Sequence, residues 1–161
     1  MMYKSVIVDI GSMAVSASPE EMLVTYALGS CIGVTFYDTV LRIGGMAHLM
    51  LPLSPVDPQR AEERPFMFVD IGVPRLLEDL FARGCRKRDL LVRMAGGAQV
   101  MSDNNLFRIG ERNVAVFRKI MWKNGLLIQG QETGGSVSRT LRLEIATGRL
   151  TIRSQGVETE L

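Results

Sequence analysis

The sequence predicts a single α/β domain of the α+β type, residues 1–161, in which mainly antiparallel β-sheet layers pack against two main helices. Short runs rich in β-branched, aliphatic and aromatic residues recur between turn residues, a pattern typical of strands. Two segments, 66–83 and 110–124, carry apolar residues at helical spacing instead. The chain has 161 residues, 47% of them apolar and 22% charged, which is enough to bury one substantial core.

The first part of the chain reads as strands and turns. Strands are expected at 5–10 and 21–28, separated at 11–19 by a loop of small residues. Two further strand-like runs, 33–38 and 42–51, flank a short turn. These two runs therefore predict a β-hairpin.

Proline and glycine mark the boundaries of the remaining elements. The stretch from Pro52 to Pro65 is expected to be an irregular exposed loop, because proline removes backbone donors and the charged residues between the prolines favour water. The helix at 66–83 is predicted to stop at Gly84 and the helix at 110–124 at Gly125. Further strands are expected at 89–95, 126–133, 139–146 and 149–154.

The predicted hairpin places a cysteine opposite a histidine. If the turn is centred between Thr39 and Val40, Cys31 faces His48, the single histidine of the chain. Directly opposed side chains have Cβ atoms about 4.5–5.5 Å apart, within reach of a hydrogen bond from thiol to imidazole. A bulge at one of the nearby glycines would shift the register by one residue and separate the two side chains.

This pair has two interpretations. A neighbouring imidazolium stabilises a thiolate and lowers its pKa from about 8.5, so Cys31 and His48 can serve as a nucleophile and its acid–base partner. The alternative is a small apolar cysteine in the core beside a hydrogen-bonded strand histidine. The two residue types alone leave both interpretations open.

Composition narrows the function classes. The formal charge is +2, and the basic residues are scattered, which argues against nucleic acid as a partner. The sequence contains no apolar stretch of about 20 residues and no secretory pattern near Met1, so we expect a cytoplasmic protein without membrane insertion. In that compartment the two cysteines are expected to remain thiols. One histidine and two cysteines do not make a common zinc site, and we expect neither metal nor cofactor.

Six sequence blocks follow one another along nearly the whole chain: TYALGSCIGVTFYD, GGMAHLMLP, VPRLLEDL, MAGGAQ, IGERNVA and ETGGSVSRTLRLEIATGRL. In this order they resemble CheD, the chemoreceptor glutamine deamidase family. The family places a threonine six residues before its nucleophile and a histidine seventeen residues after it, as Thr25, Cys31 and His48 stand here. The resemblance therefore favours the catalytic interpretation of the pair.

The resemblance implies hydrolysis of glutamine side chains on the cytoplasmic helices of chemoreceptors. Cys31 would form a thioester with release of ammonia, and His48 would transfer the protons and activate water. Thr25 would orient the imidazole. The turn at Gly29 and Ser30 would expose the backbone N–H of Cys31 as an oxyanion donor. Receptor methyl esters are a further substrate class that the resemblance implies.

Two other functions remain compatible with the sequence. The family resemblance also implies a regulatory role, in which the chain binds a CheC-type response-regulator phosphatase and has little catalysis of its own. A cysteine hydrolase acting on an unrelated small amide is the third possibility. For the receptor deamidase, Cys31 and His48 are expected at an accessible groove beside Pro52–Pro65 and the turn at Gly96 and Gly97. Met50 and Phe66 are candidates for apolar contact with the receptor helix, but core packing is the expected role of each.

A few positions depart from the family pattern or have no assigned role. Tyr26 and Ala27 stand where the family often has smaller residues or glycine, and Gln99 follows the double glycine at a variable position. The run 96–99 lacks the lysine and hydroxyl residue of a phosphate loop, so we expect a turn there. Cys85 has basic neighbours but no acid–base partner close in sequence, and we expect it to be structural or incidental.

Overall fold

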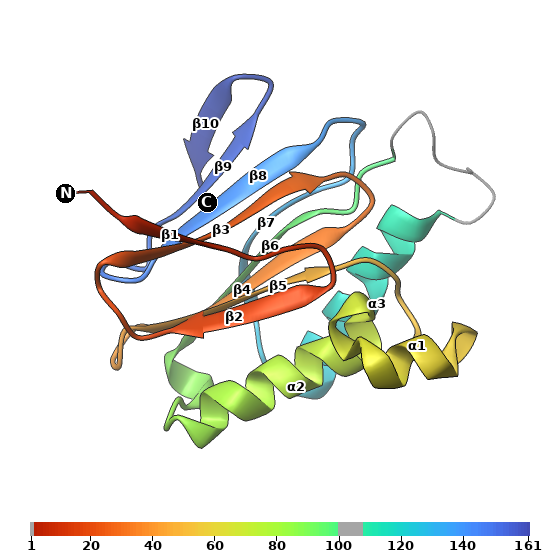
Figure 1. The fold of residues 1–161 in the computed structure, drawn as a ribbon, viewed down its shortest axis with the longest axis horizontal. Coiled ribbons are helices and arrows are strands. Elements are labelled where there is room, and N and C mark those ends of the chain that lie inside the picture. Colours follow the sequence, from red (N-terminus) through yellow and green to blue (C-terminus); the bar gives the residue numbers. More distant parts are fainter. Residues whose placement is uncertain (1, 100–107) are drawn as a thin grey trace.

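The computed structural model describes residues 2–99 and 108–161, which form two stacked sheets with helices on one side (Figure 1). The first sheet has the strand order β1 (Lys4–Ile7), β3 (Glu21–Leu28), β8 (Arg139–Glu144), β9 (Leu150–Ser154) and β10 (Val157–Glu160). The second has the order β2 (Ser12–Ser16), β5 (Ile43–Leu49), β4 (Ile32–Asp38), β6 (Leu90–Gly96) and β7 (Ile128–Thr133). The α-helices are α1 (Pro58–Glu63), α2 (Val69–Ala82) and α3 (Ile109–Lys123).

Two apolar layers hold this arrangement together. Leu23 and Leu141 from the first sheet pack against Met46 of the second. The opposite face of the second sheet packs on the helices, with Phe36 against Phe117 of α3 at a ring-centroid distance of 6.2 Å. Every residue of β4 is buried, because this central strand is covered on both faces. The predicted α/β class with mainly antiparallel sheets and two main helices is confirmed.

In the described part of the chain, two of the strand pairs are parallel, β6 with β7 and β1 with β3. β6 and β7 run parallel, and α3 lies between them in the chain as the crossover that parallel neighbours require. β1 also runs parallel to β3. The remaining strand pairs are antiparallel, and two of them, β4–β5 and β8–β9, are the hairpins expected from the sequence.

Three segments contain an element that the sequence did not predict. The expected loop at 11–19 contains β2, which pairs with β5, because its small residues hide the alternation of a strand. The expected irregular loop at 52–65 contains α1, where Pro58 occupies the first turn and Asp57 caps Arg60 N–H at 3.1 Å. β10 was not predicted at all, since all four of its residues are exposed and lack apolar alternation.

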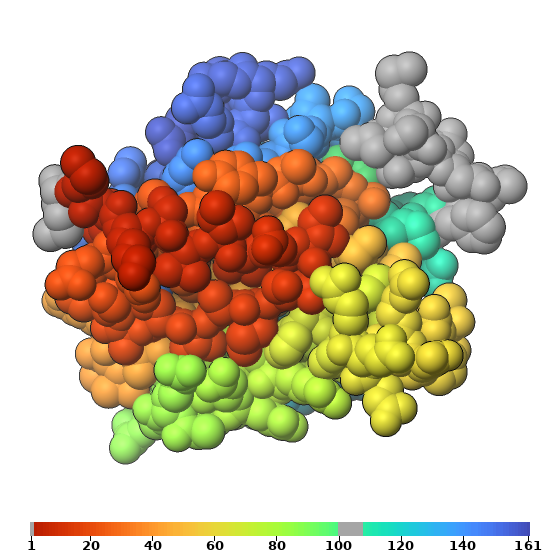
Figure 2. Space-filling model, in the orientation of Figure 1, coloured from red at the N-terminus to blue at the C-terminus, as the bar shows by residue number. Residues whose placement is uncertain are grey.

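The space-filling view shows how the surface is divided among these elements (Figure 2). The N-terminal strands (red) spread across this face, and the α1 region (yellow) protrudes near the N-terminal part of α3 (turquoise). Within residues 2–99 and 108–161, no helix is both long enough and apolar enough to cross a bilayer.

Candidate active site

The hairpin of β4 and β5 places His48 opposite Gly33, not opposite Cys31 as the sequence prediction had it. The turn contains four residues, 39–42, because the Asp38 carboxylate accepts the N–H groups of Val40 and Leu41 at 2.9 and 2.7 Å. Its centre is therefore one residue later than predicted, and the register moves by two.

A register change of two residues keeps side chains on the same face of a sheet. A Cβ on Gly33 would lie 2.7 Å from Leu141 of the first sheet, so this face points into the layer between the sheets. Cys31 stands two residues before Gly33 and packs against the same inter-sheet cluster. Cys31 and His48 are thus diagonal rather than direct neighbours, a relation in which Cα atoms are about 7–8 Å apart.

The first sheet supplies the contact that orients His48. Thr25 Oγ1 lies 2.6 Å from His48 Nδ1 and 2.6 Å from the carbonyl oxygen of Val8, to which it donates. Because a hydroxyl has one hydrogen, the oxygen of Thr25 then accepts from Nδ1–H. This pair of bonds leaves Nε2 of the imidazole as the unprotonated nitrogen.

Burial keeps that imidazole neutral. His48 is 1% exposed, and desolvation lowers its pKa to about 4, with the Asp9 carboxylate partly offsetting the effect. Nε2 is buried without a hydrogen-bond partner among the described residues. At pH 7 His48 is therefore a base ready to accept a proton, rather than a preformed imidazolium.

The lowered pKa of His48 predicts an acid-sensitive fold. Between pH 6.5 and about 4 the unfolded chain protonates His48 and the native protein does not, so the free energy of unfolding falls as the pH falls through this window. The full shift corresponds to about 3 kcal/mol. We expect urea unfolding between pH 7 and 4 to show this loss in the wild type relative to His48→Asn, which does not titrate there. Parallel stability profiles of the two proteins would contradict the prediction.

The loop that carries Cys31 is fixed through its carbonyl groups. Gly29 O accepts from Ala98 N–H at 2.8 Å, and Cys31 O accepts from Gly97 N–H at 2.9 Å. Between them, Ser30 O accepts from the side-chain amide of Asn113 at 2.9 Å. Three successive peptide groups therefore have defined orientations before any substrate binds.

Glycine allows the segment after β6 to lie against this loop. Gly96 has φ = +110°, and a Cβ there would lie 2.3 Å from Cys31 O. Gly97 has φ = +64°, and a Cβ there would lie 2.4 Å from Val114 of α3. The double glycine thus lets the chain after β6 run between the cysteine loop and α3; Gly96 ends the strand and 97–99 form no turn, so the turn expected at 96–99 is wrong.

A bulge in β3 separates Thr25 from the cysteine loop. The register with β8 shifts between Thr25 and Leu28, and Ala27 has φ = +57°. This left-handed conformation is the one that glycine adopts most easily, so the alanine at position 27 carries backbone strain that glycine would avoid. Tyr26 is exposed and lies under the Arg142 guanidinium, 5.9 Å from the ring centroid.

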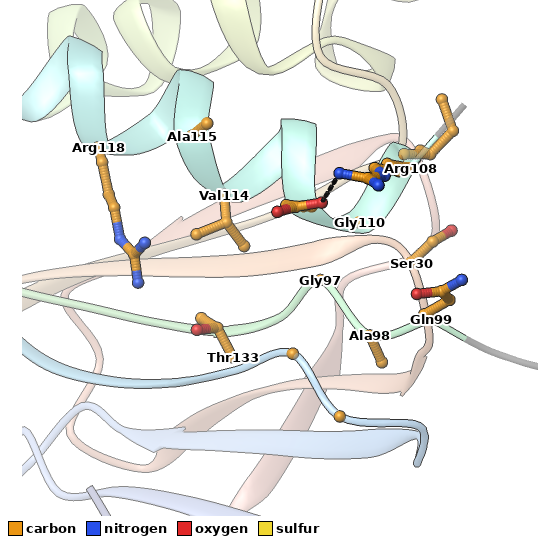
Figure 3. A pocket seen from close by; sticks show the side chains of 14 residues that line it. Ser30, Gly97, Ala98, Gln99, Arg108, Gly110, Val114, Ala115, Arg118 and Thr133 are labelled. Carbon is orange, nitrogen blue, oxygen red and sulfur yellow. Dashed lines mark ion pairs between the residues drawn. The ribbon is translucent and has the colours of Figure 1, made fainter. Parts of the chain in front are cut away.

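A pocket of about 580 Å³ borders the same loop (Figure 3). It lies between the N-terminal half of α3, the 97–99 segment and the end of β7, and Ser30 and Gln99 line it. Arg118 points from α3 toward β7 and binds Gln131, while Arg108 pairs with Glu111 at 3.8 Å. Gly97 contributes to its lining, but Cys31, His48 and the Pro52–Pro65 segment are not among the described residues that line it, so this pocket is not the expected groove.

The second cysteine lies elsewhere. Cys85 is buried in the layer between the second sheet and the helices, and burial, together with Asp38, raises the pKa of its thiol to about 11. Both cysteines are thiols. In the described parts of the chain, no three His, Cys, Asp or Glu side chains gather in a way that could hold a metal ion.

Sequence reasoning did not single out Asn113, which joins α3 to the cysteine loop. The available signal was its place in the block IGERNVA, where a polar residue interrupts the buried side of a predicted helix. Helical spacing alone leaves such a residue on either the core or the solvent side.

Comparison with known proteins gives a consistent result. Residues 50–154 match the family model described as "CheD chemotactic sensory transduction". A protein of Solibacter usitatus named "Probable chemoreceptor glutamine deamidase CheD" is 48% identical over 158 residues, 98% of this chain and 94% of that protein. Relatives in Syntrophus aciditrophicus ("Probable chemoreceptor glutamine deamidase CheD 1") and Clostridium kluyveri ("Probable chemoreceptor glutamine deamidase CheD") are 46% and 38% identical. They cover 94% and 98% of this chain and 94% and 97% of their own length. The chain belongs to the CheD family.

Proposed function

We propose that the protein is a glutamine deamidase that acts on chemoreceptors, with Cys31 and His48 as its catalytic residues and Thr25 as the residue that positions His48. The relatives' names support the reaction and the substrate class. The observation that carries the residue assignment is the bond between Thr25 and His48, which directs the basic Nε2 away from Thr25 in the layer that Cys31 also borders. The substrate segment is a cytoplasmic receptor helix, so the enzyme acts in the cytoplasm.

In the proposed reaction the Cys31 sulfur attacks the carboxamide carbon while His48 Nε2 takes the thiol proton. The tetrahedral intermediate collapses when the imidazolium returns that proton to the amide nitrogen, and ammonia leaves with the broken C–N bond. His48 then removes a proton from water, which attacks the thioester carbon. Glutamate and the thiol are released when the C–S bond breaks and the sulfur regains its proton.

Thr25 has a positioning role in this scheme. Its hydroxyl holds the imidazole in the tautomer that can act as a base, and it stabilises the imidazolium through the Nδ1–H bond. The developing oxyanion needs a donor, for which we propose the backbone N–H of Cys31 at the Gly29–Ser30 turn. A methyl ester offers the same acyl carbon and a better leaving group, so receptor methyl esters are a second substrate class.

Mass spectrometry of a purified chemoreceptor cytoplasmic fragment tests the proposal. Incubation with the protein should raise the mass by about one dalton for each converted glutamine, with release of an equal amount of ammonia, and peptide mapping should identify the sites. Unchanged receptor masses would overturn the proposal. Unchanged masses together with tight binding of a CheC-type phosphatase would favour the regulatory alternative, and turnover of a small free amide alone would favour the third.

A further inference from the structure

We propose that Asn113 is a positioning residue that directs the backbone N–H of Cys31 toward the reacting carbonyl group. This role rests on the proposed deamidase function. Asn113 lies on α3 and is 0% exposed, although asparagine is an unfavourable residue inside a helix. Its Nδ2 donates to Ser30 O at 2.9 Å and to Met50 O at 3.0 Å.

The bond to Ser30 acts on Cys31 through the geometry of one peptide group. Ser30 C=O and Cys31 N–H belong to the same peptide unit, and in a trans peptide they point in opposite directions. Because Asn113 draws the carbonyl oxygen toward α3, the N–H of Cys31 points away from α3. When the Cys31 sulfur attacks the amide carbon, the negative charge develops on the substrate carbonyl oxygen, which then needs a donor close to the sulfur, and the N–H of the same residue meets this requirement.

The bond to Met50 ties the histidine strand to the same side chain. Met50 stands two residues after His48, immediately beyond the end of β5. One amide group thus links the residue before the nucleophile with the chain after the base, and both hydrogens of Nδ2 are used. The amide orientation is also defined, since both partners are carbonyl oxygens and only nitrogen can donate to them.

The surroundings of Asn113 indicate that its donors matter more than its contribution to stability. Its Oδ1 is buried and has no hydrogen-bond partner among the described residues, an arrangement that is unfavourable for folding. The helix also lies close to the 97–99 segment, as shown by the 2.5 Å that would separate a Cβ at Gly110 from Ala98 O. An apolar side chain at position 113 would fill the same buried volume as Asn113 and would not leave an acceptor atom without a hydrogen bond.

Comparison of two reactions of the same thiol tests this role. Deamidation passes through a tetrahedral oxyanion, whereas alkylation of Cys31 by iodoacetamide displaces iodide and forms no oxyanion. We expect Asn113→Ala and Asn113→Asp to lower the kcat for receptor deamidation about 10- to 100-fold per folded molecule, with KM within about threefold. The alkylation rate of Cys31 should stay within about threefold of the wild type. Folded fractions are measured by near-ultraviolet circular dichroism, so partial unfolding is corrected in both reactions.

The control is a second asparagine, Asn124, which directly follows the last residue of the same helix. Asn124 donates its Nδ2 to Ile120 O at 2.8 Å at the end of α3, and Asn124→Ala should leave both rates unchanged. If wild-type protein deamidates the receptor but deamidation and alkylation fall by equal factors in the Asn113 variants, or neither changes, the positioning role is wrong. If the wild type itself does not deamidate, the proposed function fails instead.

Discussion

Replacing Cys31 with alanine is expected to abolish receptor deamidation, with a loss of about 10⁴-fold or more, while the protein remains folded. Without the sulfur no thioester can form, and His48 has no thiol to deprotonate. The substitution removes a single atom from a half-buried side chain at the border of the inter-sheet cluster, so little packing is lost. Intact-mass measurement of the receptor fragment gives the activity, and urea unfolding gives the stability.

Cys85→Ala is the matched control for this experiment. It removes the same atom, but from a buried thiol whose pKa is raised to about 11, so a reactive thiolate is not available at pH 7. We expect full activity and a loss of about 1–2 kcal/mol in the free energy of unfolding, because a small cavity remains. Equal loss of deamidation in the two folded variants would remove the reason to assign the nucleophile to Cys31.

The second large effect is expected for Gly96→Ala. The new Cβ would collide with Cys31 O at 2.3 Å, and φ = +110° is a conformation that alanine rarely adopts. The two strands must separate or the cysteine loop must move. We expect a loss of at least about 3 kcal/mol in the free energy of unfolding, and a large loss of deamidation in whatever protein remains folded.

Gly125→Ala is the matched control for Gly96→Ala, because it introduces the backbone strain of a positive φ without a steric collision. Gly125 also has a positive φ, +68°, but a Cβ there has no atom within 4 Å. We therefore expect Gly125→Ala to lower stability by only about 1 kcal/mol and to keep full activity. Urea unfolding of both variants at one pH provides the comparison. Similar losses for the two would show that close contact with the cysteine loop is not what requires glycine at position 96.

Sequence patterns predicted most of the fold because most strands and both long helices carry strong periodicity. The strand at 21–28 has the bounds expected, and α3 differs from its expected range by one residue at each end. β2 and α1 were missed for a local reason: small residues weaken the strand alternation, and prolines before a helix look like loop residues. Such short elements depend on the neighbours they pair or pack with.

In the candidate site, too, sequence spacing identified some residues, whereas contacts between distant parts of the chain could not be predicted. Thr25, Cys31 and His48 come from motif spacing, and the structure places the Thr25 hydroxyl beside the imidazole. The hairpin register was wrong by two residues, because turn length depends on the Asp38 side chain and not on hydrophobic pattern. Asn113 is 83 residues from its partner Ser30, and no local pattern reports a contact over that separation.

The three fixed carbonyl groups around Cys31 have a consequence for substrate length. Hydrogen bonds from Ala98, Asn113 and Gly97 hold this loop in position, so we expect that a substrate side chain must be long enough to bring its carboxamide to Cys31. Asparagine carries the same carboxamide as glutamine, but its side chain is one methylene shorter, a difference of about 1.5 Å along one C–C bond. In the proposed reaction the position of the loop therefore favours glutamine over asparagine as the substrate residue. The two side chains differ in length, although their reacting groups are chemically alike.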